Sequence, residues 1–88
     1  MYYFYVLQST KKPNWFYKGS TSDLKKRIEG HNHKETLSNK PYLPLRLVYY
    51  EAYLTKDAAI ERERSVKKSG SVWKPLMKRI KQSLAEEL

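Results

Sequence analysis

Two segments near the start of the chain, YYFYVLQ at residues 2–8 and WFYKG at residues 15–19, are rich in residues that favour β-strands. The polar segment between them, STKKPN, carries Pro13 and Asn14 and has the composition of a turn. Together they predict a β-hairpin over residues 2–19. This hairpin constrains the fold more than any other feature, because it commits the start of the chain to an antiparallel sheet. It also places the phenols of Tyr5 and Tyr17 side by side.

The residues after the hairpin predict a helix, a loop and a third strand. Thr21 or Ser22 is expected to cap a helix whose apolar residues are spaced four apart and which ends near His33. The segment 34–44 is polar, contains two prolines and is expected to form a long mobile loop over a groove. Residues 45–52 are the third predicted strand.

Two helices are predicted for the remainder of the chain. Thr55 is expected to cap the second helix, which starts at Lys56 and stops at Gly70. Ser71 is expected to cap the third, with Pro75 accommodated in its first turn. Apolar side chains at helical spacing give this helix a core-facing stripe: Trp73, Leu76, Met77, Ile80 and Leu84. The sequence therefore predicts an α+β fold, a small three-stranded antiparallel sheet flanked by about three helices. Residues 1–82 form the domain and residues 83–88 a C-terminal tail.

Charge and composition favour a nucleic-acid partner. The chain has 18 Lys and Arg against 9 Asp and Glu, a net charge of +9, together with eight tyrosines and two tryptophans that can stack on bases. The alternative is that the charge only keeps a small protein soluble. No segment has the roughly 20 apolar residues that span a bilayer, and the N-terminus lacks the pattern of a signal peptide. A cytoplasmic protein without a membrane partner is expected. The absence of cysteine excludes disulfides and thiolate zinc sites.

Several polar side chains are candidates for chemistry. Arg27 and His31 lie four residues apart and share a helix face, where both can contact a phosphate. Glu63 falls on or beside the apolar face of its helix and needs an arginine or a metal ion as partner. The structural alternatives are a solvated basic helix face, a capping or surface role for His31, and an edge-of-core Glu63 paired with a nearby lysine. The phenols of Tyr5 and Tyr17 are either core residues or partners in phosphodiester hydrolysis.

Four short stretches together resemble the GIY-YIG nuclease family. They are FYV at residues 4–6, YKG at 17–19, Arg27 in SDLKKRIEGHN, and Glu63 in AAIERERSVKK. More closely, these stretches resemble the small single-domain bacterial members, which are similar to the N-terminal catalytic domain of the nicking component of the excision-repair excinuclease. The resemblance covers about residues 2–80 and implies a small α/β layer on a three-stranded antiparallel sheet.

The resemblance also implies a role for each catalytic candidate. Tyr5 would be the first-motif tyrosine and a candidate general base, and Tyr17 would position the phosphate or the attacking water. Arg27 would stabilise the transition state, His31 would lie near the phosphate, and Glu63 would bind a single Mg²⁺ or Mn²⁺ ion. Six further residues are candidates for contacts with nucleic acid: Lys18, Ser20, Lys25, Lys26, Lys67 and Lys68.

The sequence departs from the family pattern at four positions. Phe4 replaces the first glycine of the family name and Lys18 replaces the second isoleucine, and both positions are mainly structural. Ser20 replaces a lysine, which removes one cation near the phosphate. Pro75 falls near a position where some relatives have an asparagine that contacts the site.

These features predict a divalent-metal-dependent endonuclease that hydrolyses phosphodiester bonds in DNA, with RNA as an alternative substrate and DNA repair or recombination as the setting. A homodimer or a partner protein is a candidate source of specificity, since 88 residues leave no room for a recognition domain. The alternative function is a non-catalytic module that binds nucleic acid with the same basic and aromatic face.

Overall fold

The structure is a computed structural model that describes residues 1–33 and 37–87. Its elements follow one another along the chain as β1 (Tyr2–Ser9), β2 (Phe16–Thr21), α1 (Leu24–Asn32), the 3₁₀ helix η1 (Leu37–Tyr42), β3 (Leu45–Tyr53), α2 (Lys56–Lys68) and α3 (Gly70–Glu86). The predicted α+β class is confirmed. No helix among the described residues is both long enough and apolar enough to cross a membrane.

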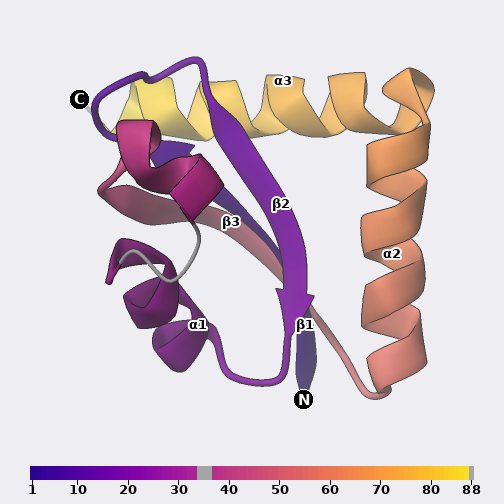
Figure 1. The fold of residues 1–88 in the computed structure, drawn as a ribbon. Coiled ribbons are helices and arrows are strands. Elements are labelled where there is room, and N and C mark those ends of the chain that lie inside the picture. Colours follow the sequence, from indigo (N-terminus) through magenta and orange to yellow (C-terminus); the bar gives the residue numbers. More distant parts are fainter. Residues whose placement is uncertain (34–36, 88) are drawn as a thin grey trace.

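The three strands form one antiparallel sheet in the order β2-β1-β3 (Figure 1). β1 is the central strand because the hairpin partner β2 pairs with one edge and β3, which follows later in the chain, pairs with the other. In this register Tyr5 lies opposite Gly19 on β2 and opposite Tyr50 on β3. The predicted hairpin and third strand are therefore confirmed.

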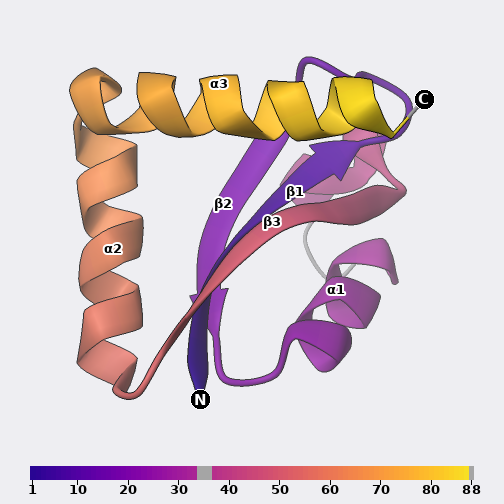
Figure 2. The same cartoon turned by 180° about the vertical axis from the view of Figure 1, so that it is seen from behind.

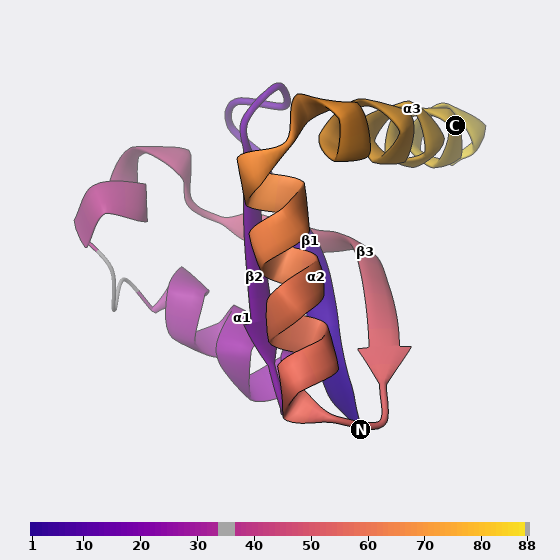
Figure 3. The same ribbon diagram turned by 90° about the vertical axis from the view of Figure 1, so that its right-hand side faces the viewer.

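Helices cover both faces of the sheet, with α1 on one side and α3 on the other (Figure 3). Alternate side chains of β1 point to opposite faces. Phe4 and Val6 pack in a cluster with buried residues of α2 and α3, whereas Tyr5 and Leu7 belong to a second cluster that α1 helps to cover. Burial on both faces explains why β1 is an almost continuous apolar run.

The first helix begins later than predicted. Its N-cap is Asp23, whose carboxylate accepts a hydrogen bond from the backbone N–H of Lys26 at 3.1 Å. The prediction of Thr21 or Ser22 was wrong, because Thr21 uses its hydroxyl to accept from the N–H of Asp23 and so holds the turn before the helix. The second helix starts as predicted, with the Thr55 hydroxyl accepting from Ala58 N–H at 3.2 Å.

The junction between α2 and α3 also differs from the prediction. Ser69 is extended, ends α2 and precedes α3, so Gly70 is the first residue of α3 rather than the stop of α2. Neither Gly70 as a stop nor Ser71 as a cap is correct. Because α3 starts early, Pro75 lies in its second turn, where the missing N–H leaves the Ser71 carbonyl without its usual helical donor.

Part of the predicted loop is ordered. Residues 37–42 form η1, and Tyr42 at its end stacks on Trp15 with ring centroids 4.1 Å apart and planes 7° apart. This aromatic contact joins the segment to the start of β2, a long-range interaction that polar composition did not reveal. Residues 34–36 of the predicted loop lie outside the described residues.

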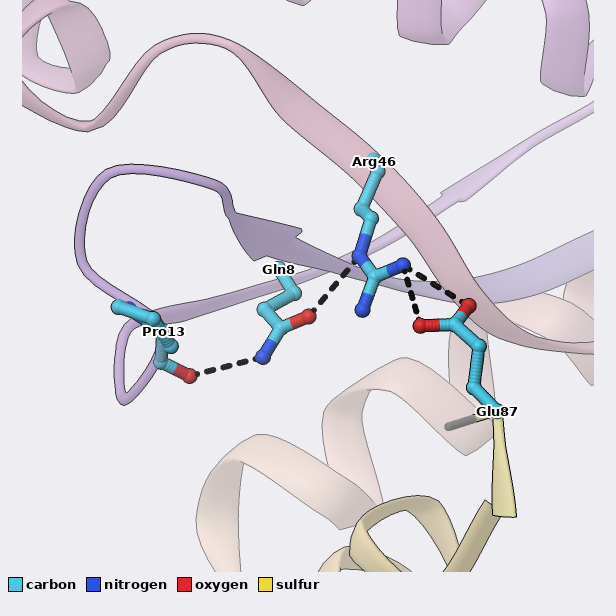
Figure 4. A network of polar contacts seen from close by, with 4 residues as sticks. All are labelled: Gln8, Pro13, Arg46 and Glu87. Atoms are coloured by element: carbon cyan, nitrogen blue, oxygen red, sulfur yellow. Dashed lines mark hydrogen bonds and ion pairs between the residues drawn. The ribbon is translucent and has the colours of Figure 1, made fainter. Parts of the chain in front are cut away.

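The C-terminal end is joined to the sheet by polar contacts (Figure 4). The Gln8 amide donates to the Pro13 carbonyl at 3.0 Å and accepts from Arg46 Nε at 3.1 Å. Arg46 in turn donates to both carboxylate oxygens of Glu87 at 3.0 Å. Helix α3 continues to Glu86, into the segment 83–88 that was expected as a tail.

Candidate active site

The Tyr5 phenol lies at the centre of a polar cluster on the α1 face of the sheet. Its side chain is fully buried, and its hydroxyl lies 3.3 Å from His31 Nε2 and accepts a hydrogen bond from Arg27 Nε at 3.3 Å. Burial raises the pKa of Tyr5, and the hydrogen bond from Arg27 only partly offsets that effect. Tyr5 is therefore held as a neutral phenol between a cation and an imidazole.

Gly19 makes room for this phenol. Because Gly19 is the cross-strand partner of Tyr5, a Cβ atom added there would lie 2.5 Å from the Tyr5 hydroxyl oxygen and 2.7 Å from its Cζ. No side chain can be placed at position 19 without moving the ring. The glycine is needed here for close approach and not for an unusual backbone angle, since no glycine among the described residues has a positive φ.

Tyr17 and His31 complete the aromatic part of the cluster. The Tyr17 ring lies 6.3 Å from the Tyr5 ring and 4.6 Å from the His31 ring, measured between centroids, and meets the histidine edge to face. His31 is the one buried residue of α1, whose other residues are exposed or half-buried. The sequence alternatives of a surface or capping histidine are thus excluded, because His33 is the C-cap residue and His31 points at the sheet.

A pocket opens beside this cluster. It has a volume of about 260 Å³ and is lined by the turn at residues 21–23 and by Lys26, Arg27, Gly30 and His31 of α1. Arg27 and Lys26 bring positive charge to one wall, and His31 brings a ring nitrogen. The hydrogen bond with Tyr5 raises the pKa of Arg27, so its guanidinium is charged. This arrangement is suited to bind a phosphate group.

Glu63 reaches the same region from α2, along the outer strand β2. Its carboxylate accepts a hydrogen bond from Lys67 Nζ at 2.7 Å, and its side chain is 23% exposed. Burial acts to raise the pKa of Glu63, but hydrogen bonds from Lys67 and Ser20, with the charges of Lys67 and Arg27, lower it overall. Glu63 is therefore ionised, and the pairing with a nearby lysine is present in this structure.

The carboxylate of Glu63 is compatible with a magnesium ion. Among the described residues, no group of three or more His, Asp or Glu side chains lies close enough together to hold a metal. Mg²⁺ usually keeps several waters and binds through one or two carboxylates together with substrate phosphates. One ionised carboxylate near a phosphate-binding pocket fits that mode. The described residues do not provide a metal site built from protein ligands alone.

The remaining candidates for nucleic-acid contacts are spread over two faces. Lys26 lines the pocket, Lys25 and Lys68 are exposed, and Lys67 lies over the Tyr17 ring at 6.0 Å. Lys18 points to the opposite face of β2, where its Nζ lies 4.1 Å from the centroid of the Trp73 ring.

Four of the five catalytic candidates, Tyr5, Tyr17, Arg27 and His31, form one cluster. The fifth, Glu63, lies beside this cluster.

Sequence reasoning missed two contributions to this site. Gly19 was seen only as part of a motif, although a small residue opposite a strand tyrosine is itself a signal of close approach. Ser20 was treated as a lost cation, whereas its hydroxyl forms a hydrogen bond that favours the ionised form of Glu63.

Comparison with known proteins supports the family indicated by this geometry. The chain matches the GIY-YIG catalytic domain over residues 1–75. It is similar to UPF0213 protein SpyM50708 of Streptococcus pyogenes serotype M5 (strain Manfredo), with 42% identity over 67 residues that cover 75% of this chain and 71% of that protein. UPF0213 protein SpyM3_1077 of Streptococcus pyogenes serotype M3 (strain ATCC BAA-595 / MGAS315) gives the same identity and coverage. No solved structure gives a significant match.

The sheet order, the Tyr5 cluster and the family match lead to the same assignment. The match spans both tyrosine motifs, Arg27 and Glu63. Nucleases with this domain generally use divalent metal ions and act on DNA. The chain belongs to the GIY-YIG family, whose catalytic domain is of the nuclease type.

Proposed function

We propose that this chain is an endonuclease that hydrolyses phosphodiester bonds in DNA and depends on a divalent metal ion. The observation that carries the proposal is the Tyr5 hydroxyl, held at 3.3 Å from both Arg27 Nε and His31 Nε2 beside a basic pocket. A phenol held between a guanidinium and an imidazole is placed for proton transfer, which the binding of nucleic acid alone does not require. DNA repair or recombination is the corresponding candidate role.

Arg27 is proposed to bind the phosphate that is cleaved. Arg27 lines the pocket, its Nε donates to Tyr5, and a further hydrogen bond joins it to Tyr17. A guanidinium has five N–H donors, so donors remain for a phosphate. These donors can contact two phosphate oxygens and stabilise the negative charge that develops as water attacks. Tyr17, whose ring contacts His31, is proposed to position the phosphate or the water.

Tyr5 and His31 are proposed to act together as the proton acceptor. A free phenolate at position 5 is disfavoured, because burial raises the pKa of Tyr5. The phenol can instead accept the proton of the attacking water while its own proton passes to His31 Nε2, 3.3 Å away. Tyr5 then stays neutral throughout, and the positive charge ends on the imidazole.

Glu63 is proposed to hold a single Mg²⁺ or Mn²⁺ ion. When bound, the ion would supply positive charge that stabilises the developing charge on the phosphate and leaving oxygen. Lys67 now neutralises this carboxylate at 2.7 Å and lies one turn further along α2. Lys67 would release Glu63 when the metal binds and would then be available to a phosphate of the substrate.

A plasmid-nicking assay at low salt, with and without Mg²⁺ or Mn²⁺, tests the proposal. The parent protein is compared with Glu63→Ala and with Glu61→Ala as a matched control. Glu61 lies on the same helix and is also ion-paired, to Arg64 at 2.7 Å, but its side chain is 64% exposed. We expect metal-dependent nicking by the parent and Glu61→Ala, and loss of nicking in Glu63→Ala.

Two outcomes would contradict the proposal. Equal loss of activity in both variants would mean that Glu63 has no special role. DNA binding without cleavage in any metal would favour the non-catalytic binding module instead.

A further inference from the structure

Helix α3 carries a basic stripe outside the candidate active site. Trp73 and Met77 form a half-buried floor, and Lys74, Lys78 and Lys81 are exposed above it around a shallow groove of about 380 Å³. The three lysines lie at i, i+4 and i+7, so they share one side of the helix. Within the described part of the chain none of them forms an ion pair. We call these five residues the α3 stripe.

Two lysines connect the α3 stripe to the active site. Lys67, on α2, pairs with Glu63 and lies over the ring of Tyr17 on β2, so it lies beside the candidate active site. Lys18 lies over the Trp73 ring at 4.1 Å and so covers one end of the stripe. Figure 2 shows the corresponding arrangement of elements, with α3 leaving the end of α2 and crossing the end of the sheet. The positive charge thus continues from Lys67, beside Glu63, through Lys18 on β2 to the lysines of α3.

Lys67 is paired with Glu63, but among the described residues Lys18 and the three lysines of the stripe form no ion pair. Burial and the nearby charge of Lys67 lower the pKa of Lys18. Holding two ammonium groups close enough to repel each other is unfavourable unless an anion binds between or beside them. Apart from Glu86 in the last turn, α3 itself has no acidic residue.

We propose that the α3 stripe is a second docking surface for the nucleic-acid substrate and binds the phosphate backbone on one side of the cleaved bond. This inference rests on the proposed function, because it assumes that the same molecule lies in the active site. It names residues that the family motifs do not include. A DNA strand carries a phosphate at every nucleotide, so phosphates beyond the one proposed to bind beside Arg27 can contact other basic residues.

The dimensions and charge of the stripe favour a phosphate backbone as the occupant. Lys74 and Lys81 are seven residues apart, which is about 10 Å along a helix. Phosphates of one strand repeat every 3.4 Å along a duplex axis, so this length corresponds to about three phosphates. Three flexible ammonium groups suit point contacts with phosphate oxygens, which carry no sequence information.

The experiment measures binding of a labelled DNA duplex in EDTA, so that cleavage plays no part. The stripe variant combines Lys74→Gln, Lys78→Gln and Lys81→Gln. If each lysine contacts one phosphate, the slope of log Kobs against log salt should become shallower by about 2.7, at about 0.9 per contact. Between about 50 and 200 mM salt the parent should lose about 40-fold more affinity than the variant.

A second triple variant controls for net charge. It combines Lys11→Gln, Lys40→Gln and Lys56→Gln, which remove three positive charges from exposed positions on other parts of the molecule. We expect its salt slope to change by less than about one. Circular dichroism checks that both triple variants are folded, and the single charge reversal Lys78→Glu gives an independent measurement if the stripe triple is not.

The inference is overturned if the two triple variants have the same salt slope, because binding would then depend only on net charge. It is also overturned if Lys78→Glu binds like the parent. Failure of the proposed function gives a different result: the parent protein would not nick DNA with metal, while the stripe variant would still bind less tightly than the control. An acidic protein as the true partner would leave DNA binding unchanged in the stripe variant.

Discussion

Replacing Gly19 by alanine should disrupt the candidate active site with a single methyl group. The new Cβ would lie 2.5 Å from the Tyr5 hydroxyl oxygen, 2.7 Å from Tyr5 Cζ and 3.1 Å from Tyr17 Cε1. Ordinary van der Waals contact begins at 3.4 Å. The Tyr5 ring must therefore move by about 0.9 Å, since it is fully buried and cannot turn into solvent.

This displacement has two measurable consequences. Overpacking of a buried site costs about 1–3 kcal/mol, which corresponds to a decrease in Tm of at least about 4–8 °C for a domain of this size. The hydrogen bonds of Tyr5 with Arg27 and His31 are each 3.3 Å long and cannot stretch by 0.9 Å and persist. A misplacement of about 1 Å at a catalytic group lowers the rate about 100-fold.

The assay is single-turnover nicking together with thermal unfolding, and Gly70→Ala is the matched control. A Cβ at Gly70 meets no atom within 4 Å, and Gly70 lies in a helix, so alanine there should stabilise the protein by up to about 1 kcal/mol and leave cleavage intact. If Gly19→Ala cleaves DNA as fast as Gly70→Ala, the position of the Tyr5 hydroxyl is not important for the reaction.

Two further predictions concern polar side chains. Tyr5→Phe keeps the ring but removes both hydrogen bonds of the phenol. Nicking should therefore fall by about 10²–10⁴-fold, with a loss of only about 1 kcal/mol of stability. Unchanged nicking would show that another group accepts the proton. Glu51 accepts hydrogen bonds from Tyr49, Tyr53 and Arg62. Burial alone would raise the pKa of Glu51, but these three partners lower it below its usual 4.5. Its stabilising contribution is therefore present above pH 4.5 and lost as the pH falls through the lower, folded-state pKa. Urea unfolding at several pH values should show a smaller acid loss in Glu51→Gln than in the parent, and equal losses would refute this linkage.

The loss of stability at alkaline pH provides a control for the Glu51 prediction. Burial, together with the hydrogen bond to Glu51, raises the pKa of Tyr49 from 10.0 to about 12. A raised pKa means that the neutral phenol stabilises the fold below pH 10 and that this contribution is lost as the pH rises toward 12. Glu51→Gln should also weaken the alkaline loss, since it removes the carboxylate that disfavours the phenolate.

Local sequence patterns determined most of the secondary structure. The strands, the Thr55 cap and the apolar stripe of α3 depend on residues close in sequence, and their signals are correspondingly local. The errors at Asp23 and Gly70 have the same origin, because adjacent residues with similar capping ability differ only in the backbone angles that the folded chain imposes.

The sequence also indicated which side chains to examine at the site, through the two tyrosine motifs and the basic composition. It could not reveal their environment. Tyr5 has a raised pKa and His31 is buried because α1 packs against the sheet, and the hydrogen bonds between them join residues 22 to 26 positions apart. Likewise, β2 brings Ser20 to Glu63, where its hydrogen bond adds to that of Lys67 in lowering the pKa of Glu63 against the effect of burial.

The arrangement of charge on the surface depends on tertiary structure in the same way. A net charge of +9 suggests a polyanion but not where it binds. Only the packing of α3 against β2 places Lys18 over Trp73 and joins the α3 stripe to the active site. The sequence by itself therefore determined the elements and the chemical groups, whereas burial and distance, which set pKa values and define a site, were decided when distant segments packed together.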